Sequence, residues 1–119
     1  MNNNTTQIFN KTNFMDNFHG MEEVAWEIIA NFIVSLPSLK KRIEMAIISK
    51  DSSELEIAAH TLKGVVSNFY AEPARVLACK LEEMGHSKMT ENNEEIFRVL
   101  NIELDRLVIV LEELVKNKG

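Results

Sequence analysis

The sequence predicts an all-α protein, an antiparallel up-down four-helix bundle with an additional short N-terminal helix. The chain has 119 residues with only 4 glycines and 2 prolines, whereas an all-β fold of this length needs many turn residues. Apolar residues recur at helical spacing, and no stretch alternates with the period of a strand. Short connections between long helices predict antiparallel neighbours. We expect a flexible leader over residues 1–7 and a single domain over residues 8–119.

The first predicted helix is short and lies close to the N-terminus. Phe14, Met15 and Phe18 belong to a small apolar segment. They are expected to cap the end of the bundle, and the alternative is that they border a docking surface. Thr12 or Asn13 is the predicted N-cap, because both side chains can accept a hydrogen bond from the first turn. Gly20 is the predicted end of this helix, since glycine readily adopts the conformation that terminates helices.

Strong helical periodicity begins at Met21 and continues to Leu36. Pro37 then interrupts the pattern. Because proline fits the first turn of a helix and disrupts its interior, Pro37 marks either a new helix start or a kink. Further apolar positions follow, and Asp51 or Ser52 is the predicted N-cap of the next helix.

The remaining chain predicts three more helices. Residues 55–69 carry an apolar stripe that recurs at helical spacing over four turns. The following helix starts near Pro73, which suits a first turn, and is predicted to end at Gly85. The last helix is predicted to begin near Thr90 and Glu91, with leucines along its inner seam.

Charge and composition exclude several classes of function. The formal net charge is −5, which is unfavourable for binding the phosphates of nucleic acid. The single cysteine, Cys79, cannot form an internal disulfide, as is usual in a reducing compartment. The sequence shows neither a signal peptide nor an apolar run near the roughly 20 residues of a membrane span. We therefore expect a cytoplasmic protein that binds neither nucleic acid nor membrane.

One histidine lies on the wrong face of its helix for a core residue. On a helical wheel His60 falls roughly 160° from the centre of the apolar stripe, so its imidazole faces water. Lys63 lies one turn further on and can reach an anion held on the ring. Gly64 costs up to ~1 kcal/mol relative to alanine inside a helix, and its missing side chain leaves room for another surface to approach. The three residues predict a phosphoryl-accepting histidine; the alternative is a surface histidine without function.

Other candidate sites are weaker. Glu56 and His60 have the spacing of two metal ligands on one helix, but a zinc site needs three or four protein ligands, so no metal site is predicted. His19 and His86 have no evident partners in the sequence. Cys79 has no visible acid-base partner, which favours a structural thiol. The adjacent acids at 82–83 and 112–113 are interpreted as solvated helix faces.

The segment from Ala59 to Gly64 resembles the signature of histidine-containing phosphotransfer (HPt) domains, in which an A-H-x-L-K-G core lies on a helix of a four-helix bundle. The resemblance extends over nearly the whole chain. The other matching positions are Phe32, Leu36, Pro37, Leu39, Asp51, Leu55, Leu77, Leu81 and Glu82. The chain departs from the family at Tyr70, where a glycine is frequent, and at Val65 and Val66, where small residues are frequent.

The resemblance implies that His60 is phosphorylated, that Lys63 stabilises the phosphoryl group and that Gly64 gives a partner access. It implies response-regulator receiver domains and a hybrid sensor histidine kinase as partners in a two-component phosphorelay. The receiver would supply Mg²⁺ and the aspartate that exchanges the phosphoryl group with His60. None of the glycines has the spacing of a nucleotide-binding loop, so we expect a phosphocarrier without a cofactor of its own and not an enzyme.

The helix of His60 also offers candidate contacts for a partner. Ile57, Glu56 and Ser67 are the predicted partner-binding residues, because they lie off the inner face close to His60. Ile57 fits a peripheral core position equally well. One rival hypothesis is a helical adaptor that docks receiver or kinase domains through the His60 face without transferring phosphate. Another is the dimerisation fragment of a histidine kinase, against which we expect a monomer.

Overall fold

The computed structural model describes residues 8–117, all of them in helices, turns and short connections. The helices are α2 (Lys11–Asp16), α3 (Glu22–Ile48), α4 (Ser52–Ser67), α5 (Glu72–His86) and α6 (Asn93–Lys116). The all-α prediction and its short N-terminal helix are confirmed. The predicted leader over residues 1–7 and the last two residues of the predicted domain lie outside the described residues.

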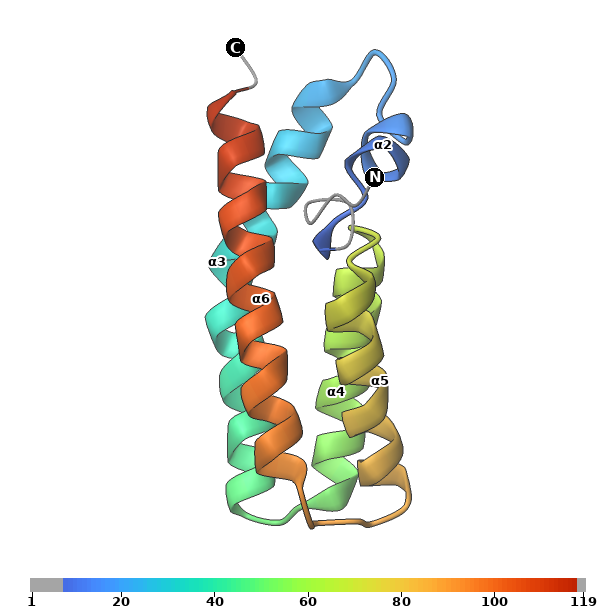
Figure 1. The fold of residues 1–119 in the computed structure, drawn as a ribbon, viewed down its shortest axis with the longest axis vertical. Helices are drawn as coiled ribbons and strands as arrows, with labels where there is room; N and C mark the ends of the chain where they lie inside the picture. The colour runs from blue at the N-terminus through green and yellow to red at the C-terminus, as the bar shows by residue number, and fades with distance from the viewer. Residues whose placement is uncertain (1–7, 118–119) are drawn as a thin grey trace, which may run out of the picture.

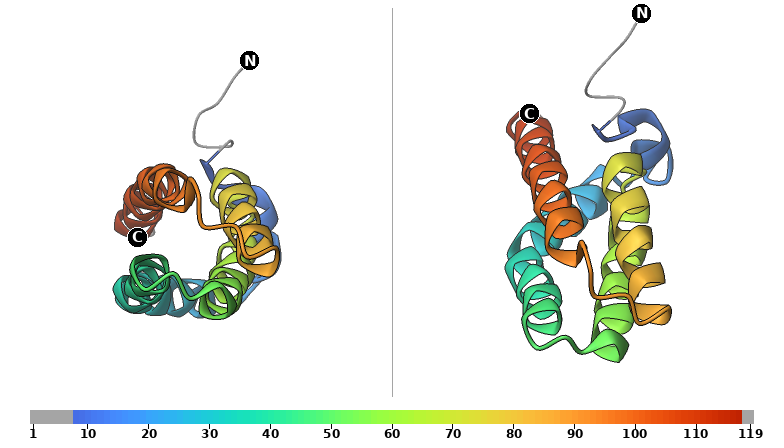
Figure 2. Two further views of the ribbon diagram at one scale, coloured as in Figure 1. Left: turned by 90° about the horizontal axis from the view of Figure 1, so that it is seen from below. Right: turned by 60° about the horizontal axis from the view of Figure 1, so that its bottom comes forward.

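Helices α3 to α6 run alternately up and down and enclose one core, while α2 lies at one end (Figures 1 and 2). The core is built mainly from fully buried leucines on the inner stripes of α4, α5 and α6: Leu55, Leu62, Leu81, Leu100, Leu104, Leu107 and Leu111. Each such side chain contributes about 1.5–3 kcal/mol by burial. No helix of the described part is both long and apolar enough to cross a membrane.

The N-terminal segment closes the end of the bundle with aromatic side chains. Phe14 is 1% exposed and stacks on Phe69 with ring centroids 5.0 Å apart. Phe69 in turn packs against Phe32 of α3 at 4.8 Å. Since centroid distances of 4.5–7 Å or so are favourable for aromatic pairs, these contacts fix the segment on the bundle. The prediction that this segment caps the bundle is confirmed.

The predicted boundaries of α2 are wrong. Asn10, two or three residues before the predicted cap, is the N-cap, and its side chain accepts a hydrogen bond from the Asn13 amide at 3.0 Å. The helix ends at Asp16, before Gly20. Gly20 lies in the following turn with φ of +76°, a conformation that glycine adopts readily.

Helix α3 continues through Pro37, so of the two alternatives the new helix start is wrong. Pro37 has no N–H for the carbonyl of Ile33, and a proline in a helix interior costs about 3 kcal/mol. Burial of Leu36 and Ile43 on the two sides of the proline offsets that cost, since both are less than 5% exposed. Figure 1 shows α3 as one bent helix, which is the usual consequence of an internal proline.

The connection between α4 and α5 is a tight turn in which Tyr70 has φ of +55°. This is the position where the resemblance leads one to expect glycine, and a left-handed conformation costs a non-glycine residue about 1 kcal/mol or more. Two contacts with the N-terminal segment hold Tyr70 there. The Asn10 amide donates to its carbonyl at 3.3 Å, and Asn17 Nδ2 donates to its hydroxyl at 3.4 Å.

The other predicted helix boundaries give mixed results. Asp51 is confirmed as the N-cap of α4, since its side chain accepts a hydrogen bond from the Glu54 amide at 3.0 Å. Pro73 lies in the first turn of α5, as predicted. Asn92, with φ of +69°, is the N-cap of α6, so this helix begins two residues later than expected.

The predicted end of α5 at Gly85 is one residue early, because the helix ends at His86 and Gly85 is buried in its last turn. A Cβ at Gly85 would lie 2.6 Å from the amide nitrogen and 2.9 Å from the Cα of Glu56, and 2.8 Å from the carbonyl oxygen of Ser52. All three are backbone atoms of α4 and cannot rotate away. Gly85 is therefore the point of closest approach between α4 and α5.

We expect Gly85→Ala to lower the free energy of unfolding by about 1–3 kcal/mol, because the added methyl group forces α4 and α5 apart. Gly64→Ala is the matched control, since a Cβ at Gly64 has no atom within 4 Å. This control should raise stability by up to ~1 kcal/mol through helix propensity. Urea-induced unfolding measures both changes. If Gly85→Ala has the same free energy of unfolding as the wild type, the close approach of α4 and α5 is contradicted.

Candidate functional site

His60 lies in the middle of α4, on the face that points away from the core. Its side chain is 67% exposed, whereas Ala59 and Leu62 beside it in the sequence are fully buried. The helical repeat produces this contrast, because neighbouring residues point about 100° apart around the axis. The exposed position predicted for His60 is confirmed.

A carboxylate from the next helix holds the imidazole of His60. Nδ1 of His60 lies 2.8 Å from Oε2 of Glu82 on α5, and the Glu82 side chain is only 20% exposed. The interpretation of Glu82 as a solvated acid is therefore wrong. Glu82 is the site residue that sequence reasoning missed, although its position had matched the family pattern.

Lys63 contacts the same carboxylate. Its Nζ lies 2.6 Å from Oε1 of Glu82, and its side chain is 27% exposed. Glu82 thus uses one oxygen for the imidazole of His60 and the other for the ammonium group of Lys63. The three side chains form a bridge between α4 and α5, with Lys63 held beside His60 and not extended into solvent.

The electrostatics of the bridge keep Glu82 ionised. The hydrogen bond from Lys63 lowers the pKa of Glu82 more than partial burial raises it, and the hydrogen bond with His60 lowers this pKa further. The same contact with Glu82 raises the pKa of Lys63. At neutral pH the pair is therefore a carboxylate and an ammonium ion, which is the stronger form of such a hydrogen bond.

An ionised Glu82 fixes the tautomer of His60. A carboxylate can only accept hydrogen bonds, so the proton in this contact belongs to Nδ1 of the imidazole. In the neutral ring the lone pair then resides on Nε2. A carboxylate that orients a histidine in this way leaves its other nitrogen free to act as a base or a nucleophile.

The surface next to His60 is open on the side of Gly64. Gly64 is exposed, and a Cβ built there meets no atom within 4 Å. Ile57 is 53% exposed, which excludes the interpretation as a core residue. Ser67 is half-buried and its hydroxyl donates to the carbonyl of Lys63 at 2.7 Å. Glu56 is half-buried and contacts His86 on α5.

His86 and Glu56 make the same kind of contact between α4 and α5 as His60 and Glu82 do. Here the histidine lies on α5 and the glutamate on α4. Nδ1 of His86 lies 3.1 Å from Oε2 of Glu56. Each of the two helices carries a glutamate four residues before a histidine, and each histidine contacts the glutamate of the other helix. The interpretation of His86 as a residue without a partner is therefore wrong. His86 ends α5, and no lysine occupies the position three residues after it, which is Met89.

Of the remaining sequence candidates, Glu56, Cys79 and His86 line one pocket between α4 and α5, together with Lys63 and Glu82. Glu56 and His60 contact different partners across α4 and α5. Within residues 8–117 no group of three or more histidine, cysteine or acidic side chains could hold a metal ion. Cys79 is half-buried, with its sulfur 3.9 Å from Glu83, and His19 lies 3.8 Å from Asp16 on the surface.

Comparison with protein families decides the assignment. The family model of the Hpt domain matches residues 27–113, which include all of α4 and α5. The chain belongs to the Hpt domain family. No curated protein and no solved structure matches the chain.

Membership in the Hpt family gives the chain a general role. Hpt domains are helical phosphocarrier modules that take part in histidine phosphotransfer within two-component phosphorelays. The match covers the bridge of His60, Lys63 and Glu82 together with Gly64. Interaction with receiver domains or kinases follows from the same membership.

The lowered pKa of Glu82 predicts a contribution to stability that depends on pH. A carboxylate whose pKa falls on folding stabilises the fold above its unfolded pKa, and this stabilisation is lost as the pH drops through the lower folded pKa. We expect the wild type to lose stability more steeply than Glu82→Gln below the ordinary value of 4.5. Chemical unfolding at a series of pH values between about 7 and about 3 measures the difference.

Glu83→Gln is the control for this measurement, because Glu83 is the exposed neighbour of Glu82 on the same helix. Its stability should follow that of the wild type at every pH. Parallel pH curves for the wild type and Glu82→Gln would show that the bridge contributes nothing to folding.

Proposed function

We propose that His60 accepts a phosphoryl group from the aspartyl phosphate of a receiver domain, or from a hybrid sensor histidine kinase, and passes it to another receiver aspartate. One observation carries this proposal. The carboxylate of Glu82 contacts Nδ1 of His60, so the lone pair lies on Nε2 of a mostly exposed ring. This is a phosphocarrier role in a phosphorelay, without a nucleotide site of its own.

In the proposed step, the lone pair of Nε2 attacks phosphorus of the receiver's aspartyl phosphate. The N–P bond forms as the bond between phosphorus and the aspartate oxygen breaks, and the aspartate leaves as a carboxylate with the electron pair. Because Nδ1 keeps its proton, the ring gains positive charge, which Glu82 neutralises at 2.8 Å. The reverse of this step delivers the phosphoryl group to the next aspartate.

Lys63 and Gly64 support the same step. The ammonium group of Lys63 has three N–H donors, so it can keep its contact with Glu82 and still bond an oxygen of the incoming phosphoryl group. The open space at Gly64 lets the receiver approach, and Ile57, Glu56 and Ser67 are proposed to border the docked partner.

The partner completes the chemistry of the proposed reaction. The chain is proposed to bind no cofactor of its own, while Mg²⁺ in the receiver neutralises the charge of the phosphoryl group during transfer. Because transfer of this group depends mainly on positioning and electrostatics, a rigid helix that presents one oriented imidazole is a sufficient contribution. We further propose that the chain acts as a monomer in the cytoplasm.

Labelling from a phosphorylated receiver tests the assignment of His60. A receiver domain carrying radiolabelled aspartyl phosphate should transfer acid-labile label to the wild type and not to His60→Gln. His86→Gln is the matched control, because His86 is also exposed with its Nδ1 held by a carboxylate. This variant should take up label as the wild type does.

Two outcomes would contradict the proposal. Equal labelling of the wild type and His60→Gln would place the phosphoryl group elsewhere. A chain that binds phosphorylated receivers and never takes up label from any of them would be the adaptor considered above.

Variants of Glu82 test its role as a positioning residue. We expect Glu82→Ala to lower the rate of phosphoryl transfer by about tenfold or more, because the tautomer of His60 is no longer fixed. Glu82→Gln should recover much of this loss, since its amide oxygen still accepts a hydrogen bond from Nδ1. Nitrogen-15 NMR of the ring reports the tautomer directly.

A purely structural role of Glu82 predicts a different result. The imidazole spectrum would then be the same in the wild type and in Glu82→Ala, and the two Glu82 variants would lose activity in proportion to their loss of stability.

A further inference from the structure

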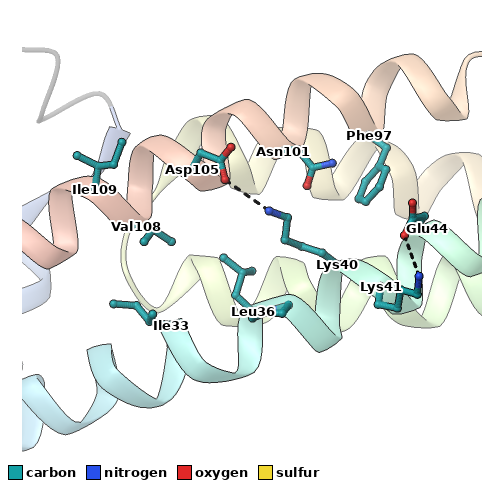
Figure 3. Close-up of a pocket in the computed structure, with 11 residues that line it drawn as sticks. Ile33, Leu36, Lys40, Lys41, Glu44, Phe97, Asn101, Asp105, Val108 and Ile109 are labelled. Carbon is teal, nitrogen blue, oxygen red and sulfur yellow. Dashed lines mark hydrogen bonds and ion pairs between the residues drawn. The ribbon is translucent and has the colours of Figure 1, made fainter.

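A groove runs between α3 and α6 (Figure 3). These two helices lie on the side of the bundle opposite the α4–α5 pair (Figure 2). Its volume is about 730 Å³. Of the neighbouring pairs in the four-helix bundle, α3 and α6 pack least closely, and α4 and α5 most closely. The groove therefore forms a second recessed surface, away from His60.

Two helical stripes form the walls of the groove over about three turns. At one end the lining is apolar, and Figure 3 shows Ile33 and Leu36 of α3 pointing toward Val108 of α6. The lining residues of α3 follow the spacing of one helix face, from Ile33 to Glu44. Parallel ridges of this kind are the surface into which the side chains of a third helix pack.

Apolar surface continues outside the groove at this end. Val34 is 79% exposed and Ile109 is 59% exposed. Ile109 lines the groove, and Val34 lies next to the lining residue Ile33. A small molecule enclosed by the groove would leave this outer surface in water, whereas a helix lying along the groove covers it. The extended apolar rim therefore favours a macromolecular occupant.

The two rims differ in net charge, since α3 contributes Lys40, Lys41 and Glu44 to the groove and α6 contributes Asp105. Lys41 is 67% exposed and lies 3.6 Å from Glu44 on the same helix. Lys40 reaches across to Asp105, which is 70% exposed, at 3.5 Å (Figure 3). Exposed ion pairs of this kind are weak, so both rims can exchange them for contacts with a partner.

We propose that the α3–α6 groove binds an amphipathic helix of a partner protein. The apolar stripe of that helix packs between Ile33 and Val108. Its acidic flank faces Lys41, and its basic flank faces Asp105. Because the groove and His60 lie on opposite sides of the bundle, this binding leaves the phosphotransfer face free.

A synthetic helical peptide tests the groove directly. The probe has about 16 residues, with leucine at every third or fourth position, glutamate along one flank and arginine along the other. Titration into nitrogen-15-labelled protein should shift the amide signals of residues 33–44 and 97–109. A peptide of the same composition with its leucines scattered around the helix should leave these signals unchanged.

Substitutions on the rim supply the matched comparison. Val34→Lys and Ile109→Lys replace exposed side chains, so the fold is retained, and each should weaken peptide binding by about tenfold or more. Ile48→Lys is the control, because Ile48 is also on α3 and 63% exposed but lies beyond Glu44, the last α3 residue that lines the groove, whereas Val34 lies within the lining stretch. It should bind the peptide as the wild type does.

Three outcomes would overturn the proposal. Peptide-induced shifts on α4 and α5, or equal affinity of Ile109→Lys and the wild type, would place the peptide elsewhere. Shifts at the groove that grow with protein concentration in the absence of peptide would make a second copy of this chain the occupant. Phosphotransfer by His60 enters none of these measurements, so failure here leaves the proposed function unaffected.

Discussion

The proposed phosphotransfer face depends on one carboxylate placed between two helices. Glu82 binds the imidazole of His60 with one oxygen and the ammonium group of Lys63 with the other. Gly85 lets α4 and α5 lie close together beside this bridge, since any side chain there would meet the backbone of α4. A glycine in the last turn of one helix thus supports the orientation of a histidine on the other. The packing of α4 against α5 and the tautomer of His60 are therefore linked.

The α4–α5 pair and the α3–α6 pair lie on opposite sides of the four-helix bundle (Figure 2). The α4–α5 pair is held by glycine packing and by two reciprocal contacts between histidine and glutamate. The α3–α6 pair leaves a groove bridged by the exposed contact of Lys40 with Asp105. Rigid presentation of an imidazole needs the first kind of surface, because phosphoryl transfer is sensitive to position. Binding a partner helix needs the second kind, in which apolar walls remain uncovered.

Several errors of the sequence-based prediction share one cause. Glycine and proline were interpreted through their local effect on the backbone, as ends and starts of helices. Pro73 obeys that rule, whereas Pro37 lies inside α3 and Gly85 lies one residue before the end of α5, where it does not act as the cap. At Pro37 the buried neighbours outweigh the lost hydrogen bond, and at Gly85 the approach of another helix requires the absence of a side chain. Tyr70 shows the converse, because contacts with the N-terminal segment hold a non-glycine residue in a left-handed turn.

The sequence by itself determined the helices, their inner faces and the exposure of His60 and Gly64, because a period of 3.6 residues assigns every side chain to a face. It also determined the family, through the residues around His60. Only the tertiary structure decided which residue holds the imidazole. Glu82 and Glu83 are adjacent acids of one helix, and the rotation of α5 against α4 directs the first toward His60 and leaves the second in solvent. The same is true of the α3–α6 groove, since helical periodicity identifies apolar faces but the separation between two helices depends on how all four pack.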